Sequence, residues 1–477
     1  MNETKPLSTQ STPSPATTKK RSRRPDTAGI NRIPPISQLF VLGLQHVLVM
    51  YAGAVAVPLV LGPSLGLPKD QVAYLISADL FCCGIVTLMQ SFGIGRYLGI
   101  RLPVIMSVSF AAVTPMVAIG ALPDVGLTGI FGATIASGLI ALLAVPLIGK
   151  LMPLFPTVVT GVVITSIGIS ISQVGVNWIA GGVGNPQYGS LHYIGISFLV
   201  LLFILVLTRY SKGFISSISV LLGIIFGFVV AALCGDVSMA GLEEAEWFAL
   251  ILPFHFGLPT FEPVSIATLT VVMLITFIES MGMFLALGEM VERPATKRDI
   301  TRGLRVDAIG TIFGGIFNCF PHTSFSQNIG LVGVTGVSSR WVCVMAGAIM
   351  IVLGLFPKLS IVVASVPPFV LGGAGIVMFG MVLSTGIRIL SRADYTNRFN
   401  LFIIAVSLSI GMIPVCGGPS FFQHFPAELQ PVLHSGILLS TISAVILNLC
   451  FNGYQSDVIQ KTKPLITKVP TPEENKA

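Results

Sequence analysis

Residues 321–336 read Pro-His-Thr-Ser-Phe-Ser-Gln-Asn-Ile-Gly-Leu-Val-Gly-Val-Thr-Gly, a polar and glycine-rich stretch between apolar runs. The apolar neighbours predict that it lies at membrane depth, where irregular backbone is tolerated only if it is buried in protein or lines a cavity. A break of this kind among hydrophobic helices indicates a binding site. Gln327 and Asn328 lie inside the break, and both side chains can donate and accept hydrogen bonds.

The composition predicts a polytopic membrane protein. Hydrophobic residues make up 53% of the 477-residue chain and charged residues only 10%, whereas a soluble protein carries about 25% charged residues. The seven cysteines are scattered and odd in number, so they indicate neither a disulfide framework nor a metal site. No cofactor is expected, and nucleic acid is not an expected partner.

Fourteen apolar stretches are candidate membrane spans, which predicts an all-α protein embedded in a lipid bilayer. They lie near residues 36–62, 71–91, 104–119, 128–149, 154–175, 193–208, 214–234, 264–291, 303–319, 324–336, 341–356, 369–387, 399–413 and 435–452. Those at 104–119 and 324–336 are shorter than the roughly 20 residues that cross a bilayer. An even count places both tails on one side of the membrane.

Lysine and arginine give an independent check of the topology. With the N-terminus inside, the two tails hold 11 of the 27 basic residues, and the cytoplasmic loops with the adjoining span ends hold 14. Only Lys69 and Lys358 fall outside. This asymmetry follows the positive-inside rule and predicts that both termini are cytoplasmic. Residues 1–32 are basic, rich in Ser, Thr and Pro, and lack a signal-peptide core, so they are predicted to be a disordered tail.

The two short stretches occupy the third position in each set of seven spans. Residues 101–115 place Pro103 before Ser109 and Phe110, much as Pro321 precedes Ser326 and Gln327. Each stretch is predicted to be a short extended piece followed by a half-helix. Seven plus seven spans with matching interruptions predict an inverted repeat with a substrate site at the midplane.

Glu279 is the ionisable residue placed most centrally in an expected span. A carboxylate at the bilayer centre costs about 2.5–3.5 kcal/mol on insertion scales. Glu279 shares a helix face with Gly282, Met283 and Ala286. We predict that it accepts hydrogen bonds from substrate N–H groups and can take up a proton when unpaired. The alternative is a carboxylate satisfied by neighbouring hydroxyl groups.

Asp307 and His46 are further candidates inside the spans. Asp307 precedes Gly310 and Gly314, which share one face and allow close helix approach. It either carries a proton or braces the site, or it is a solvated cap beside Arg305. His46 is predicted to be a structural hydrogen-bonding residue rather than a titrating switch.

Together these residues predict a site for a flat, polar heterocycle. Gln327 and Asn328 offer donors and acceptors to a purine-like ring, Phe110 offers an aromatic face, and Ser109 offers a further hydrogen bond. No lysine or arginine is placed at depth to hold a permanent anion. This disfavours sulfate or bicarbonate, although a half-helix N-terminus can bind an anion without side-chain charge.

The chain resembles the nucleobase–ascorbate transporter family. The family signature reads Gln/Glu/Pro, Asn, any residue, Gly, four residues, Thr, then Arg, Lys or Gly. It is satisfied here by Gln327, Asn328, Gly330, Thr335 and Gly336.

Further positions carry the same resemblance. The Gln45-His46 pair matches the family's first-span motif, and Glu279 and Asp307 match its acidic positions in spans 8 and 9. The resemblance extends over about residues 33–453 and looks strongest with bacterial urate and xanthine permeases.

The resemblance implies a particular domain organisation. The core domain would comprise residues 33–150 (spans 1–4) and 263–366 (spans 8–11), and the gate domain residues 151–262 (spans 5–7) and 367–453 (spans 12–14). Residues 1–32 and 454–477 would be cytoplasmic tails. The family further implies a homodimer through the gate in the inner membrane, elevator-like alternating access, and proton symport, with protons as the coupling ion.

The resemblance also implies residue roles by matching position. Glu279 and Gln327 would bind a purine, with Phe110 stacking on it. Ser109, Met283 and Ser326 complete the expected substrate-binding set. Asn328 and Asp307 would support binding and coupling, and His46 would brace the core.

Four positions bear on the substrate. Uracil permeases carry Glu in place of Gln327 and His in place of Met283, so uracil is disfavoured. Ser109 matches urate-accepting members, because a small side chain leaves room for the C8 oxygen of urate. Gly336 stands where close urate permeases often have Arg.

We therefore predict import of urate, xanthine or both. The alternatives are a permease for uracil or another nucleobase and a same-fold anion transporter. An intramembrane enzyme is not expected, because it would need a nucleophile–base pair or a metal cluster, and the sequence indicates neither.

Overall fold

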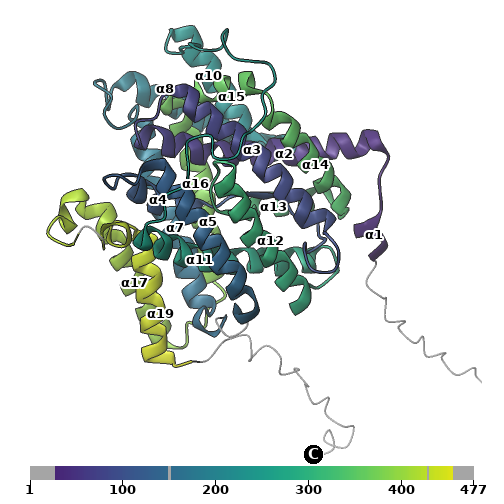
Figure 1. Ribbon diagram of the computed structural model, residues 1–477, viewed down its shortest axis with the longest axis vertical. Helices are drawn as coiled ribbons and strands as arrows, with labels where there is room; N and C mark the ends of the chain where they lie inside the picture. Colours follow the sequence, from purple (N-terminus) through teal and green to yellow (C-terminus); the bar gives the residue numbers. More distant parts are fainter. Residues whose placement is uncertain (1–26, 149–151, 427–428, 455–477) are drawn as a thin grey trace, which may run out of the picture.

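The computed structural model describes residues 27–148, 152–426 and 429–454, which are mostly helical (Figure 1). The elements of the first half are α1 (Thr27–Asn31), α2 (Ile36–Ser64), α3 (Lys69–Phe92), β1 (Met106–Val108), η1 (Phe110–Ala112), α4 (Val113–Gly120), α5 (Gly126–Ala144), η2 (Val145–Leu147), η3 (Met152–Leu154), α7 (Thr157–Ile179), α8 (Leu191–Tyr210), α9 (Phe214–Ser217) and α10 (Ser219–Cys234). Those of the second half are α11 (Pro263–Met290), α12 (Lys297–Ile316), β2 (His322–Ser324), α13 (Ser326–Thr335), α14 (Arg340–Gly354), α15 (Pro357–Ala364), α16 (Pro368–Leu390), α17 (Arg398–Gly417), η4 (Pro419–Phe422), α18 (Gln430–Leu433) and α19 (Gly436–Asn452).

Each of the fourteen apolar stretches contains a helix. Among the described residues, eight helices are long and apolar enough to cross a membrane: α2, α3, α5 with η2, α7, α8, α11, α16 and α17. Helices α14 and α15 form a further candidate span that bends by 82°. The chain is therefore a helical, multi-pass membrane protein, and the count of fourteen spans stays a prediction.

The helices pack in two groups. The first group contains α2, α3, α5, α11, α12 and α14, together with both strands. The second contains α7, α8, α10, α16, α17 and α19. Contacts between the groups are sparser and involve pairs such as α2 with α10 and α11 with α7. In Figure 1, α3 and α14 of the first group lie opposite α17 and α19 of the second.

Helices α3 and α14 approach each other closely in the first group. A Cβ atom on Gly84 would lie 2.7 Å from the carbonyl oxygen of Gly347, and one on Gly347 would lie 2.9 Å from that of Gly84. Small residues at such a crossing bring the two backbones together, which is how membrane helices gain packing energy without a hydrophobic driving force between them.

Gly84→Ala is expected to lower the thermal unfolding midpoint of the purified protein, because the added methyl group meets backbone atoms that cannot move aside. Gly195→Ala in α8 is the matched control, since no heavy atom lies within 4 Å of the new Cβ there. Both changes raise helix propensity by about 1 kcal/mol. A midpoint for Gly84→Ala equal to or above that of the control would contradict the close packing.

Both interruptions have the form predicted from the sequence. Strand β1 is followed by η1 and α4, and β2 by the ten-residue helix α13. The strands pair antiparallel, with Met106 opposite Ser324 and Val108 opposite His322. The two breaks therefore satisfy each other's backbone hydrogen bonds, as backbone buried away from water must be satisfied.

The tail prediction needs one correction. Residues 27–32 were included in the predicted disordered tail, but Thr27–Asn31 forms α1. Ile30 is buried, and the carbonyl oxygen of Arg32 accepts a hydrogen bond from Ser339 Oγ at 2.6 Å. These contacts fasten the segment to the start of α14. Residues 1–26 and 455–477, which make up most of the two predicted tails, lie outside the described residues.

The segment between α10 and α11 is bonded to the first group. Leu252 N donates to Tyr74 Oη at 2.9 Å, and Leu252 O accepts from Asn318 Nδ2 at 3.0 Å. Thr260 N donates to Thr128 O at 3.2 Å. The sequence grouped residues 235–262 with spans 5–7, but these contacts join residues 252–260 to α3, to α5 and to the end of α12.

Candidate functional site

The two breaks bring their following helices together. Beyond the strand pairing, Ser109 N donates to Pro321 O at 2.8 Å, and Phe325 N donates to Ile105 O at 2.9 Å. Phe110 begins η1, and Phe325 is the residue before α13. Both aromatic residues are thereby held next to the strand pair, and both line one small cavity.

A small cavity lies where these residues meet Glu279. Its walls come from the first helix group (Val108, Phe110, Glu279, Thr323, Ser324 and Phe325) and from the second (Ile164, Val382 and Thr385). Its volume is about 20 Å³, enough for a single water molecule. A purine ring does not fit in this conformation, so a ligand of that size requires the two walls to move apart.

Glu279 lies in the middle of α11 and is half-buried. The neighbouring Ser280 fastens α11 to β2, since its hydroxyl oxygen lies 3.2 Å from Thr323 Oγ1 and accepts a hydrogen bond from Ser324 N at 3.2 Å. The carboxyl group is thus set beside the strand pair by hydrogen bonds of an adjacent residue.

Phe110 is half-buried at the same cavity. Its ring contacts Phe379 of α16 edge to face, with 6.0 Å between ring centroids. The aromatic wall therefore spans the boundary between the two helix groups.

Ser109 and Met283 do not line this cavity as the described residues form it. Ser109 is buried, and its hydroxyl oxygen caps η1 by accepting a hydrogen bond from Ala111 N at 3.3 Å. Met283 is buried about one helical turn after Glu279 among apolar neighbours. The sequence placed both beside the ligand, whereas here Ser109 supports the segment that carries Phe110.

Ser326 and Gln327 lie in the first turn of α13, but their side chains fall outside the described residues. Gly336, the last residue of the signature, ends this helix. It adopts φ of 67°, in the left-handed region that glycine reaches at little cost, and donates to Val332 O at 2.9 Å. It is exposed and does not line the cavity.

Asp307 is completely buried in α12. Its Oδ1 accepts a hydrogen bond from Gln90 Nε2 at 3.0 Å, and its Oδ2 has no partner among the described residues. Gln90 Oε1 in turn accepts from Ile100 N at 3.2 Å. Asp307 is therefore not a solvated cap, which removes one of the two alternatives drawn from the sequence.

Asn328 and His46 are in direct contact. Asn328 Nδ2 lies 3.0 Å from both the His46 carbonyl oxygen and His46 Nδ1, and both residues are buried. Because the amide group donates to the carbonyl oxygen, its second N–H is placed to donate to a neutral, unprotonated Nδ1. The pair joins α13 to α2.

Asn328→Ala is expected to lower the unfolding free energy by about 1–3 kcal/mol, because it leaves buried acceptors unpaired. His46→Leu removes one of the same hydrogen bonds, so the double variant should lose less than the two single losses combined. Unfolding midpoints of the purified proteins measure this coupling. The control is the double variant of Asn328→Ala with Ser64→Ala, which also lies on helix α2. Its loss of unfolding free energy should equal the two single losses combined.

Several wall residues were not identified from the sequence. Thr323 and Phe325 lie in residues 321–336, but the sequence does not mark them as site residues, and it gives no signal for Ile164, Val382 and Thr385. The last three lie in apolar helices α7 and α16, where no charge or break marks the face turned to the cavity.

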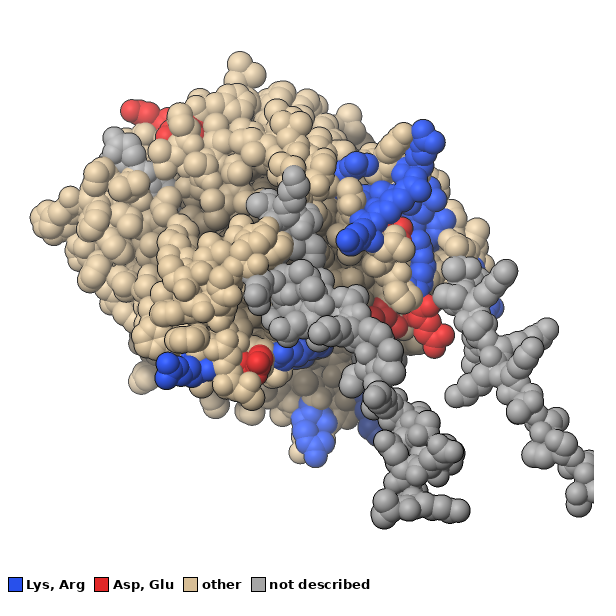
Figure 2. Space-filling view, turned by 90° about the horizontal axis from the view of Figure 1, so that it is seen from below, with Lys and Arg blue, Asp and Glu red and all other residues tan. Residues whose placement is uncertain are grey.

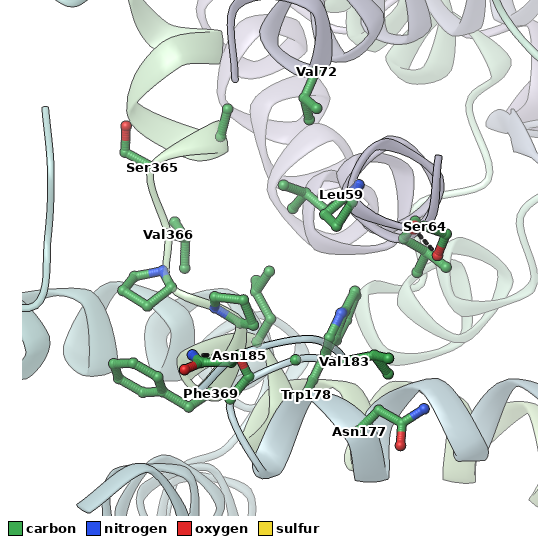
Figure 3. Close-up of a pocket in the computed structure, with 18 of the residues that line it drawn as sticks. Leu59, Ser64, Val72, Asn177, Trp178, Val183, Asn185, Ser365, Val366 and Phe369 are labelled. Atoms are coloured by element: carbon green, nitrogen blue, oxygen red, sulfur yellow. Dashed lines mark hydrogen bonds between the residues drawn. The ribbon is translucent and has the colours of Figure 1, made fainter. Parts of the chain in front are cut away.

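A larger cavity of about 460 Å³ lies between the two helix groups. In Figure 3, Leu59 and Ser64 of α2 lie on one side, with Trp178, Val183 and Phe369 on the other. Asn177 and Asn185 add amide groups to its lining. The boundary between the groups is thus hollow at these residues.

Comparison with known proteins places this chain in a family. The sequence model of a permease family (Xan_ur_permease) matches residues 37–418. The uric acid transporter UacT of Escherichia coli is 64% identical over 439 residues, covering 91% of each chain. From Bacillus subtilis, the uric acid permease PucJ is 44% identical and the xanthine permease 42%, each match covering 87% of this chain and 93% of the relative.

Solved structures share the fold at low sequence identity. The transmembrane domain of the cyanobacterial bicarbonate transporter BicA aligns with a TM-score of 0.55 at 15% identity, covering 87% of this chain and 98% of that one. SLC26A9 aligns with a TM-score of 0.56 at 12% identity, covering 87% of this chain and 66% of that one. From its family match and its close relatives, the chain belongs to this permease family and is a multi-pass membrane transport protein rather than an enzyme.

Proposed function

We propose that the protein is a proton-coupled symporter that imports the oxidised purine bases urate and xanthine across the inner membrane. The observation that carries this proposal is the meeting of Glu279 and Phe110 on one cavity between two helix groups. A carboxylate and an aromatic face are what a flat heterocycle with several N–H groups requires. Three of the similar proteins are named as transporters or permeases of uric acid or xanthine, which supports urate and xanthine as substrates here.

The purine is held by complementary polar and aromatic groups. Glu279 accepts hydrogen bonds from ring N–H groups, and such charge-assisted bonds are roughly twice as strong as neutral ones. Phe110 stacks on the ring, and Gln327 at the start of α13 reads its remaining donors and acceptors. Ser326, in the same turn of α13, adds a further hydrogen bond to the purine. Ser109 and Met283 support the residues that contact the purine.

Transport proceeds by movement of one helix group against the other. The first helix group is the core domain (residues 33–150 and 263–366), to which residues 252–260 are also hydrogen-bonded. The second helix group is the gate domain (residues 151–262 and 367–453). Substrate sites of inverted-repeat transporters lie near the midplane between such units. The sparse contacts between the groups and the larger cavity at their boundary support an elevator-like movement of the core.

Protons couple through two acids inside the first helix group, Glu279 and Asp307. Glu279 faces the cavity, and Asp307 lies behind it on α12 with one carboxyl oxygen unpaired among the described residues. Neutralising a buried carboxylate removes the cost of holding its charge at membrane depth. His46 and Asn328 brace the start of α13 and carry no proton in this scheme.

The membrane orientation is part of the proposal. Both termini face the cytoplasm, since the positive-inside rule favours the basic loops on that side. A homodimer through the gate domain, as in the resembling family, completes the arrangement.

The substrate class is tested by uptake into proteoliposomes with an inward proton gradient. Labelled urate and xanthine are expected to accumulate, and unlabelled uracil or bicarbonate in excess should not compete. In a parallel assay, accumulation of labelled uracil without accumulation of either purine would favour the nucleobase alternative. Uptake of labelled bicarbonate without purine accumulation would favour the anion transporter.

A further inference from the structure

A cluster of arginines lies at the end of the first helix group remote from the cavity of Figure 3. The cluster consists of Arg101, Arg293, Arg298, Arg302 and Arg340. Figure 2 shows a large group of Lys and Arg side chains on one part of the molecular face, with acidic side chains next to it and smaller basic groups elsewhere on that face. The loop after α3, the loop after α11 and the starts of α12 and α14 all contribute to the cluster.

The positive charge of this arginine cluster is poorly compensated. Among the described residues, the acidic partner of these arginines is Asp299, whose Oδ1 lies 3.6 Å from Arg293 Nη2 and 3.9 Å from Arg302 Nη1. Its other oxygen, Oδ2, already accepts hydrogen bonds from Thr296 in the capping box of α12. Asp299 therefore forms ion pairs with two of the five arginines, and the guanidinium groups of the cluster repel one another.

Three guanidinium nitrogens in the described part of the chain are buried without a hydrogen-bond partner: Arg101 Nε, Arg302 Nε and Arg302 Nη2. The side chain of Arg302 is only 12% exposed. An unpaired buried donor that carries charge is costly, and native proteins supply such groups with an acceptor. The missing acceptor is a group that brings several oxygen atoms and negative charge.

The backbone holds these arginines in place. Arg101 has φ of 59°, a conformation unfavourable for a residue with a Cβ, and its Nη2 donates to Gly95 O at 2.7 Å. Arg293 Nη1 donates to Arg101 O at 3.1 Å, and Gly99 N donates to Arg302 O at 3.2 Å. The donors are thus fixed before any ligand arrives, which lowers the ordering cost of binding.

We propose that Arg101 and Arg302 bind a phosphate-type oxyanion, with Arg293, Arg298 and Arg340 supplying further positive charge. The planar guanidinium fork matches the oxygens of a phosphate group and binds them in bidentate fashion. The anion is either free phosphate or the headgroup of an acidic phospholipid, because the cluster lies where the protein would meet the cytoplasmic leaflet. This site is separate from the purine cavity and does not depend on the proposed substrate.

The anion site also connects to Asp307. Arg101 N donates to Gln90 O at 3.1 Å, and the side chain of Gln90 donates to Asp307 Oδ1. Occupancy of the arginine cluster therefore stabilises the segment that positions Asp307.

The test is the thermal unfolding midpoint of the purified full chain. Sodium phosphate is titrated against sodium chloride at equal ionic strength. In a second arm, mixed micelles contain phosphatidylglycerol in place of phosphatidylcholine. Phosphate is expected to raise the midpoint in a saturable manner. In Arg302→Gln the concentration for half-maximal stabilisation should rise by about tenfold or more, as expected for the loss of a charged hydrogen bond.

Arg101→Gln should weaken the effect similarly, and Arg388→Gln should leave it unchanged. Arg388 is the matched control because it is an exposed arginine in the last turn of α16, in the other helix group. If Arg302→Gln does not fold, Arg302→Lys keeps the charge without the fork and should still bind more weakly than the wild type.

Stabilisation by phosphatidylglycerol but not by phosphate would support the site and identify a lipid headgroup as its source. Stabilisation by phosphate in both lipid mixtures would support the site and identify a soluble anion as its ligand. No stabilisation beyond chloride and phosphatidylcholine would overturn the proposal, as would equal effects in wild type, Arg302→Gln and Arg101→Gln.

Discussion

Glu279→Gln is expected to abolish high-affinity purine uptake while leaving the protein folded. The glutamine keeps the size of the side chain but cannot accept charge-assisted hydrogen bonds from ring N–H groups or bind the coupled proton. Hydrogen bonds to charged groups contribute about 1.5–3 kcal/mol each. The loss of two such bonds predicts at least about a 100-fold fall in kcat/KM, measured as initial uptake of labelled urate into proteoliposomes.

Glu289→Gln is the matched control for this prediction. Glu289 lies on the same helix, but it is exposed in the last turn of α11 and does not line the cavity. Its substitution should leave uptake near the wild-type rate. Unfolding midpoints of both variants show whether the proteins are intact. Normal uptake by a folded Glu279→Gln variant would refute the role assigned to this carboxylate.

Phe110→Ala is expected to cause the second-largest loss of transport. Stacking between a base and an aromatic side chain is worth about 1–3 kcal/mol by alanine substitution, so kcat/KM should fall by roughly 5- to 150-fold. Phe110→Tyr and Phe110→Trp retain an aromatic face and should restore part of the uptake. Kinetics of urate uptake over a range of concentrations measure each variant.

Phe81→Ala separates stacking from a general loss of packing. Phe81 packs against Phe313 and Phe317, at centroid distances of 6.5 and 5.9 Å, and does not line the cavity. Its substitution should lower the unfolding midpoint more than it lowers uptake. The stacking role is wrong if Phe81→Ala and Phe110→Ala reduce uptake equally, or if an aromatic replacement at position 110 restores nothing.

The paired interruptions were predictable because membrane depth restricts what a polar, proline-containing stretch can do. Such a stretch cannot lie against lipid with its backbone unpaired. Both breaks therefore had to find partners inside the protein, and β1 and β2 provide them for each other. The buried state of Asp307 was not predictable in this way, because its place near the end of a span beside Arg305 left a solvated position open.

The contribution of the second helix group could not be predicted. Residues such as Ile164 and Val382 lie in predominantly apolar helices whose few polar residues do not mark the face turned to the cavity. Hydrophobic periodicity then no longer distinguishes the two faces. Which face turns toward Glu279 is decided by tertiary packing alone.

Long-range polar partners were equally hidden. Gln90 holds Asp307 although the two residues are 217 positions apart, and nothing in the local sequence of either one specifies the other. Residues 27–31 read as a tail because the helix they form packs against α14, more than 300 positions later in the chain. Local composition predicts neither contact.

The most direct test of proton-coupled purine transport is the equilibrium accumulation of labelled urate in proteoliposomes as a function of the pH difference, with the membrane potential clamped at zero. One proton carried with each urate molecule predicts a tenfold rise in the inside-to-outside ratio per pH unit, equivalent to about 1.4 kcal/mol. A protonophore should return the ratio to one. A ratio that stays at one across all pH differences in the wild type would contradict the account.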